Sequence, residues 1–122
     1  MKIKTKRVYD KPDPGDGFRV LVDRLWPRGL SRADAKIDLW LKDIAPSNEL
    51  RKWFNHDPDK WHGFKKKFFA ELDANRDAVD DLLSRAGRGR VCFLYASKEQ
   101  KLNNAAALKD YIESFSKPAR GK

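Results

Sequence analysis

Residues 18–31 read FRVLVDRLWPRGLS, and this stretch decides the fold. Its first part, Phe18–Val22, is almost entirely apolar, β-branched or aromatic, which is typical of a central strand covered on both faces. Pro27 lacks the backbone N–H that an inner strand donates, so the strand must end before it. Between them lie Asp23 and Arg24. The chain therefore leaves a buried strand through charged side chains.

The neighbouring segments complete the pattern of a small sheet. Val91–Ala96 has the composition of a second buried strand. Lys2–Tyr9 carries its lysines on one side of a period-two pattern, which predicts an edge strand with a wet face. Residues 10–17, DKPDPGDG, form a turn-rich loop. Residues 37–46, IDLWLKDIAP, are compatible with a short strand or with an extended segment on the core.

Helix signals fill the remainder of the chain. Ser47 and Asp57 are of the residue types that favour the N-cap of a helix, so each predicts a helix start. Pro58 follows Asp57 at the first helical position, which proline prefers. Apolar side chains then recur three and four residues apart at Trp61, Phe64, Phe68 and Leu72. Two further helices are predicted over about 75–86 and 103–115.

Buried strands joined by helices pair in parallel through right-handed crossovers. We therefore predict a single α/β domain over residues 1–116, with a short, mostly parallel sheet flanked by helices. The basic segment 117–122, KPARGK, is predicted to be a disordered tail.

Composition limits the functional classes. With 122 residues the chain suits one domain with its own core. It has 27 Lys and Arg against 18 Asp and Glu, and the net charge of +9 favours anionic partners, nucleic acid among them. The single cysteine, Cys92, lies in an apolar run and is expected in the core. Without a disulfide pair or an apolar amino-terminal stretch, we expect a cytoplasmic protein with no membrane contact.

Polar side chains follow both buried strands, and ligands of open parallel sheets bind outside the carboxyl ends of the strands. An arginine fork, a lysine charge and the free N–H groups of a helix start suit a phosphate or carboxylate. The sequence therefore predicts a binding site for an anionic small molecule, and the predicted ligand-binding residues are Arg24, Trp26, Lys98, Asn103 and Asn104.

Whether the protein is an enzyme stays open. If it is one, Asp23 is the candidate base or arginine-orienting group, and Arg28 is the candidate for stabilising transition-state charge. No phosphate-binding loop, dinucleotide fingerprint or nucleophile elbow is present, so no cofactor is expected. His56 and His62 stand six residues apart, not at the four-residue spacing of a helical metal pair, and no metal site is predicted.

Structural alternatives apply to the same residues. Asp23 and Arg24 could form an ion pair that ends a strand, Trp26 could only pack, and Asn103 or Asn104 could cap a helix without any ligand. Two alternative functions also remain. One is a nucleic-acid-binding module with an exposed tryptophan and a basic surface made of Lys2, Lys4, Lys6 and Lys65–Lys67. The other is an adaptor for a protein partner; the oligomeric state is open.

Three segments carry a resemblance to a known family. Residues 19–31, 39–61 and 93–108, among them RVLVDRLWPRGLS and FLYASKEQKLNNAAAL, resemble the YeaO-like branch of the domain-of-unknown-function 488 family of bacterial proteins. The resemblance covers about residues 3–115 and implies a stand-alone cytoplasmic α/β domain of this size with no assigned activity. Longer relatives place a cysteine and a His-Arg pair near the end of the second buried strand. This chain has Tyr95 and Leu-Asn-Asn there, which argues against thiol chemistry.

Overall fold

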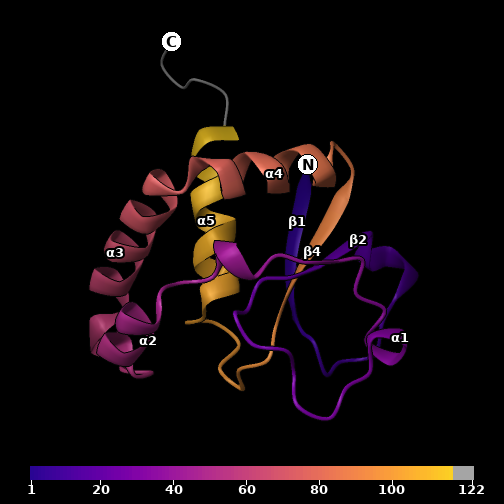
Figure 1. Cartoon of the computed structure of the whole chain (residues 1–122), viewed down its shortest axis with the longest axis horizontal. Coiled ribbons are helices and arrows are strands. Elements are labelled where there is room, and N and C mark those ends of the chain that lie inside the picture. The colour runs from indigo at the N-terminus through magenta and orange to yellow at the C-terminus, as the bar shows by residue number, and fades with distance from the viewer. Residues whose placement is uncertain (117–122) are drawn as a thin grey trace.

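A parallel sheet organises the molecule (Figure 1). The computed structural model describes residues 1–116, with the backbone alone for 115 and 116, and the predicted tail lies outside the described residues. Within this range four strands pair in the order β1-β4-β2-β3, all in parallel. Their bounds are Lys2–Arg7 for β1, Phe18–Leu21 for β2, Leu39–Trp40 for β3 and Arg90–Tyr95 for β4. The predicted fold class, the edge position of β1 and the inner position of β2 are confirmed.

Helices connect the strands as predicted. Their bounds are Arg32–Ala35 for α1, Asn48–Phe54 for α2, Trp61–Ala74 for α3, Arg76–Ala86 for α4 and Asn104–Ser116 for α5. The Ser47 hydroxyl accepts the Leu50 N–H at 3.1 Å, and the Asp57 carboxylate accepts the Asp59 N–H at 3.0 Å. The predicted N-cap Ser47 of α2 is confirmed. Asp57 caps the 3-10 turn η3, Pro58–Lys60, and α3 begins after this turn, so the predicted start of the α-helix at Pro58 is three residues too early. None of the helices within residues 1–116 combines the length and apolar character needed to cross a membrane.

The two faces of the sheet have separate cores. Alternate residues of β2 and β4, such as Val20 and Phe93, pack against α2–α5. The opposite face, with Leu21 and Cys92, is covered by the segment around α1 (Figure 1). Burial raises the pKa of the Cys92 thiol to about 11, so this cysteine is a protonated core residue, as the sequence predicts.

A buried ion cluster on the second face is absent from the sequence-based expectations. The 3-10 turn η1, Pro14–Asp16, places the Asp16 carboxylate 2.7 Å from Lys4, 3.1 Å from Lys6 and 2.5 Å from Arg19. Asp16 and Arg19 are 1% and 4% exposed. The Arg19 guanidinium also donates to the Ala35 carbonyl at 2.7 Å. The lysine face of β1, predicted to be solvent-exposed, is therefore partly engaged in ion pairs. These ion pairs anchor the 10–17 loop on the sheet.

Candidate functional site

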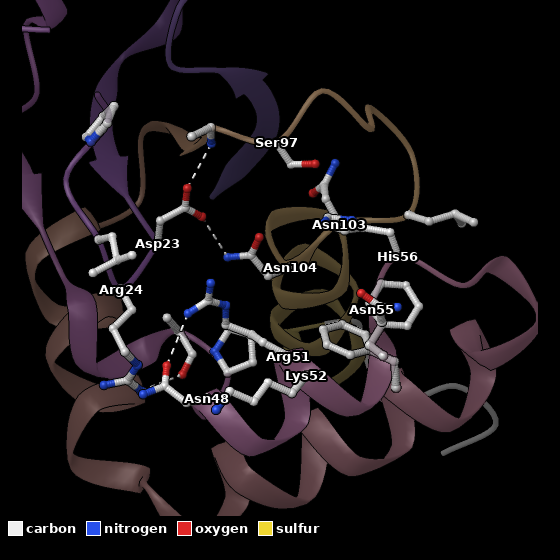
Figure 2. A pocket seen from close by; sticks show the side chains of 18 of the residues that line it. Asp23, Arg24, Asn48, Arg51, Lys52, Asn55, His56, Ser97, Asn103 and Asn104 are labelled. Carbon is white, nitrogen blue, oxygen red and sulfur yellow. Dashed lines mark hydrogen bonds between the residues drawn. The ribbon is translucent and has the colours of Figure 1, made fainter. Parts of the chain in front are cut away.

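A cavity of about 580 Å³ lies at the carboxyl edge of the sheet, where β2 and β4 end side by side. Its walls come from residues 23–28 after β2, residues 96–104 after β4 and residues 45–56 in and around α2 (Figure 2). Tyr9, which follows β1, and Phe64 of α3 complete the lining. The cavity thus occupies the place that the topology of an open parallel sheet predicts for a ligand.

Asp23 joins the exits of β2 and β4 to the start of α5. Its Oδ2 accepts the Ala96 N–H at 2.8 Å, and its Oδ1 accepts from the Asn104 amide at 3.1 Å (Figure 2). The Asn104 amide also donates to the Val22 carbonyl at 3.0 Å, while the Asp23 carbonyl accepts from Trp40 at 2.9 Å. The end of β2, the end of β4 and the first turn of α5 are therefore held together by this one carboxylate.

The hydrogen bonds of Asp23 fit a structural role better than that of a base. Burial raises its pKa above the ordinary value, while the hydrogen bonds from Ala96 and Asn104 and the charge of Arg51 act in the opposite direction. Both carboxylate oxygens already accept a hydrogen bond. Within residues 1–116 no salt bridge joins Asp23 to Arg24, so the alternative of a strand-ending ion pair is wrong.

Arg24 lines the cavity with unused hydrogen-bonding capacity. Its Nη2 donates to the Ala45 carbonyl at 3.3 Å, a long contact. Its Nε is the one buried side-chain nitrogen or oxygen without a hydrogen-bond partner in the part of the chain that the structure describes. Arg51, whose Nη1 donates to Asn48 at 3.1 Å, and Lys52 lie on the α2 wall of the same cavity (Figure 2). Guanidinium donors without acceptors in a cavity suit an anion.

The structure brings most of the predicted site residues together. The cavity is lined by Asp23, Arg24, Trp26, Arg28, Asn103 and Asn104. Lys98 is not among the lining residues. It lies in an adjoining, more open groove, which shares Tyr9 and His56 with the cavity. The loop after β4 turns at Glu99, whose carboxylate accepts the N–H groups of Lys101 and Leu102, and Lys98 is exposed on it.

Two of these residues also have structural tasks. The Trp26 indole N–H donates to the Leu30 carbonyl at 2.7 Å, and its ring meets Trp40 edge-on at 5.3 Å. Asn103 is buried, and its side-chain oxygen accepts the Ala106 N–H at 2.8 Å. The interpretation of Asn103 as the N-cap of the last helix is therefore confirmed. Asn103 and Asn104, at the start of α5, also form part of the cavity wall.

Sequence reasoning missed the contribution of α2. Arg51 and Lys52 lie three and four residues after Asn48, and Asn55, the residue that caps α2, lies four and three residues after them, so the four share one polar face, and this face lines the cavity. That spacing was a readable signal, but a polar helix face is more often solvent-exposed. His56 is exposed, and it also lines the boundary between the cavity and the groove, a position that the sequence did not indicate.

Comparisons with known proteins show which family the chain belongs to. Residues 2–120 match the family model described as the inactive DUF488-N3 subclade. The chain is 40% identical over 115 residues to the uncharacterized protein YeaO of Escherichia coli, covering 94% of this chain and 100% of that protein. It is 38% identical over 107 residues to an uncharacterized protein of Mycobacterium tuberculosis, covering 88% and 90% of the two chains. No solved structure gives a significant match. The chain therefore belongs to the DUF488 family and is a YeaO-like member of it.

Proposed function

We propose that this protein binds an anionic small molecule, through a phosphate or carboxylate group, in the cavity at the carboxyl edge of its sheet. The observation that carries the proposal is the state of Arg24, which lines the cavity and whose buried Nε has no acceptor in residues 1–116. An unsatisfied buried donor on a charged group is costly, because its hydration is lost without replacement. An anion in the cavity supplies the missing acceptor.

The charge balance of the lining supports the same ligand class. Arg24, Arg28, Arg51 and Lys52 contribute positive charge, whereas Asp23 is the sole carboxylate among the lining residues. Both oxygens of Asp23 are engaged by the protein itself. A volume of about 580 Å³ lies within the usual range of small-molecule sites.

In this proposal the protein binds its ligand and does not convert it. The family model is described as an inactive subclade, and the candidate base Asp23 is held by two hydrogen bonds. We therefore assign Asp23 the positioning of the two strand exits, and Arg28 a contact to the ligand at the rim. The reduced, buried Cys92 is compatible with the expected cytoplasmic location.

The geometry gives less support to a nucleic-acid surface. Lys4 pairs in register with Cys92, which faces the α1 side of the sheet, whereas Lys65–Lys67 belong to α3 on the other side. The two basic groups therefore do not form one continuous surface. Trp53 is exposed, and the ammonium groups of Lys60 and Lys67 each lie 5.1 Å from the centroid of its ring.

Replacing the arginine with the unsatisfied nitrogen tests the proposal. In Arg24→Gln we expect the affinity for inorganic phosphate to fall about tenfold or more, because a hydrogen bond to a charged group is worth about 1.5–3 kcal/mol. Isothermal titration calorimetry at low salt measures the change. Arg24→Lys, which keeps the charge and loses the planar fork, should retain part of the affinity.

Arg88→Gln is the matched control, since Arg88 is exposed just before β4, at the opposite edge of the sheet. It removes the same charge and should leave phosphate binding unchanged. If Arg24→Gln and Arg88→Gln lose the same affinity for phosphate, the loss comes from the change in net charge alone. This result would contradict a defined site.

A further inference from the structure

Tyr9 presents a fixed aromatic ring at the boundary of the cavity. Its hydroxyl donates to the Arg28 carbonyl at 2.8 Å, which ties the segment after β1 to the segment after β2. The Arg7 guanidinium lies 4.9 Å from the ring centroid, and it is itself held by the Ser97 carbonyl at 3.0 Å. The ring is thus anchored at its hydroxyl and stacked with a cation, yet Tyr9 stays 40% exposed.

Two exposed apolar side chains border the same opening. Among residues 1–116 the exposed large hydrophobic side chains are Met1, Tyr9, Leu25 and Trp53. Leu25, at 67% exposure, and Tyr9 both line the cavity. Exposing such side chains costs free energy unless a ligand covers them. The cavity therefore has an apolar part beside its cationic part.

The chain after α2 turns at the same boundary through two left-handed residues. After α2, Asn55 and His56 both adopt left-handed conformations, with φ of 46° and 55°. Such conformations are unfavourable for residues other than glycine and are often found at binding sites. Here they carry the His56 ring to the boundary that Tyr9 also lines, with the Phe54 ring 6.4 Å away.

We propose that the ligand carries a planar ring joined to its anionic group, and that the ring stacks on Tyr9 while Arg24 and Arg51 hold the anion. This inference rests on the proposed function and specifies its ligand class: a small aromatic phosphate or carboxylate. A bare phosphate would leave most of the cavity empty, because volumes of this size enclose whole drug-sized molecules. An aromatic ring backed by a guanidinium is a suitable stacking surface for such a ligand.

Phenyl phosphate and cyclohexyl phosphate form a matched pair of probes, similar in size and charge but planar in one case and puckered in the other. We expect the wild-type protein to bind phenyl phosphate at least about fivefold more tightly than cyclohexyl phosphate, because only the planar ring can stack on an aromatic side chain. Tyr9→Leu should abolish this preference. Tyr9→Phe should keep most of the preference, and Trp53→Leu, at an exposed aromatic residue outside the cavity lining, should keep all of it.

Different outcomes overturn different statements. Equal affinity of the wild-type protein for the two organic phosphates would overturn the ring inference and leave the anion site standing. A preference for phenyl phosphate that persists in Tyr9→Leu would overturn Tyr9 as the stacking residue. Failure of all three phosphates to bind, or binding of uncharged phenol as tight as that of phenyl phosphate, would overturn the proposed function itself.

Discussion

Replacing Asp16 with asparagine is expected to cost about 3–5 kcal/mol of the free energy of unfolding, the usual penalty for removing one partner of a buried ion cluster. The Arg19 side chain is 5% exposed and would keep its charge without the carboxylate 2.5 Å away. Lys4 and Lys6 would lose the same partner. Urea denaturation at pH 7 measures the loss. Asp81→Asn, which breaks an exposed pair with Arg85, is the control and should change stability by about 1 kcal/mol or less.

The same carboxylate sets a dependence on pH. Burial opposes the ionisation of Asp16, but hydrogen bonds from Lys4, Lys6 and Arg19 hold its pKa well below the usual range. A group with a depressed folded-state pKa stabilises the fold above its unfolded pKa and loses this contribution as the pH falls. The wild-type free energy of unfolding should therefore decrease from roughly pH 4 downward, and Asp16→Asn should lack that part of the decrease. Parallel pH curves for the two proteins would contradict this account.

Gly17→Ala is expected to lose about 3 kcal/mol or more, from backbone strain together with a steric clash. Gly17 has φ of 74° and ψ of −137°, a region that side chains rarely adopt. A Cβ there would lie 2.4 Å from the Arg90 carbonyl oxygen, which is backbone and cannot rotate away. The loop would have to leave β4 and would carry Asp16 with it. Thermal or urea unfolding measures the loss.

Gly87 provides a control that separates strain from clash. Its φ of 65° and ψ of −146° are nearly those of Gly17, but a Cβ added there meets nothing within 4 Å. Gly87→Ala should therefore lose only the strain contribution, about 1–3 kcal/mol. If Gly17→Ala and Gly87→Ala lose the same amount, the close approach of Gly17 to β4 contributes nothing to stability.

Local patterns in the sequence were sufficient to predict the fold. Phe18–Val22 and Val91–Ala96 are apolar because β2 and β4 are the inner strands, with packing on both faces. The order of the strands could not be deduced, because β3 is two residues long and pairs only with β2. The Asp16 cluster was missed because an acid in a Pro-Gly turn is usually exposed. Its burial depends on cations that come from β1 and β2.

The candidate site was predicted in part. Topology alone places both strand exits at one edge, which brought Asp23, Arg24 and Asn104 together as expected. Lys98 was misplaced because the path of a loop is set by its own turns, here the one around Glu99. The wall made by α2 was missed because the polar spacing of its residues is also typical of a solvent-exposed helix face, and only the packing of α2 in the folded protein places that face at the strand exits.

The central claim is that a defined cavity at the carboxyl edge binds an anion, and an amide chemical-shift titration with phosphate tests it most directly. We predict saturable shifts confined to the segments that contribute lining residues, namely Tyr9, 23–28, 45–56, Phe64, 96–97 and 102–104. Shifts spread over the lysines of β1 and α3, or the absence of shifts at saturating phosphate, would contradict it.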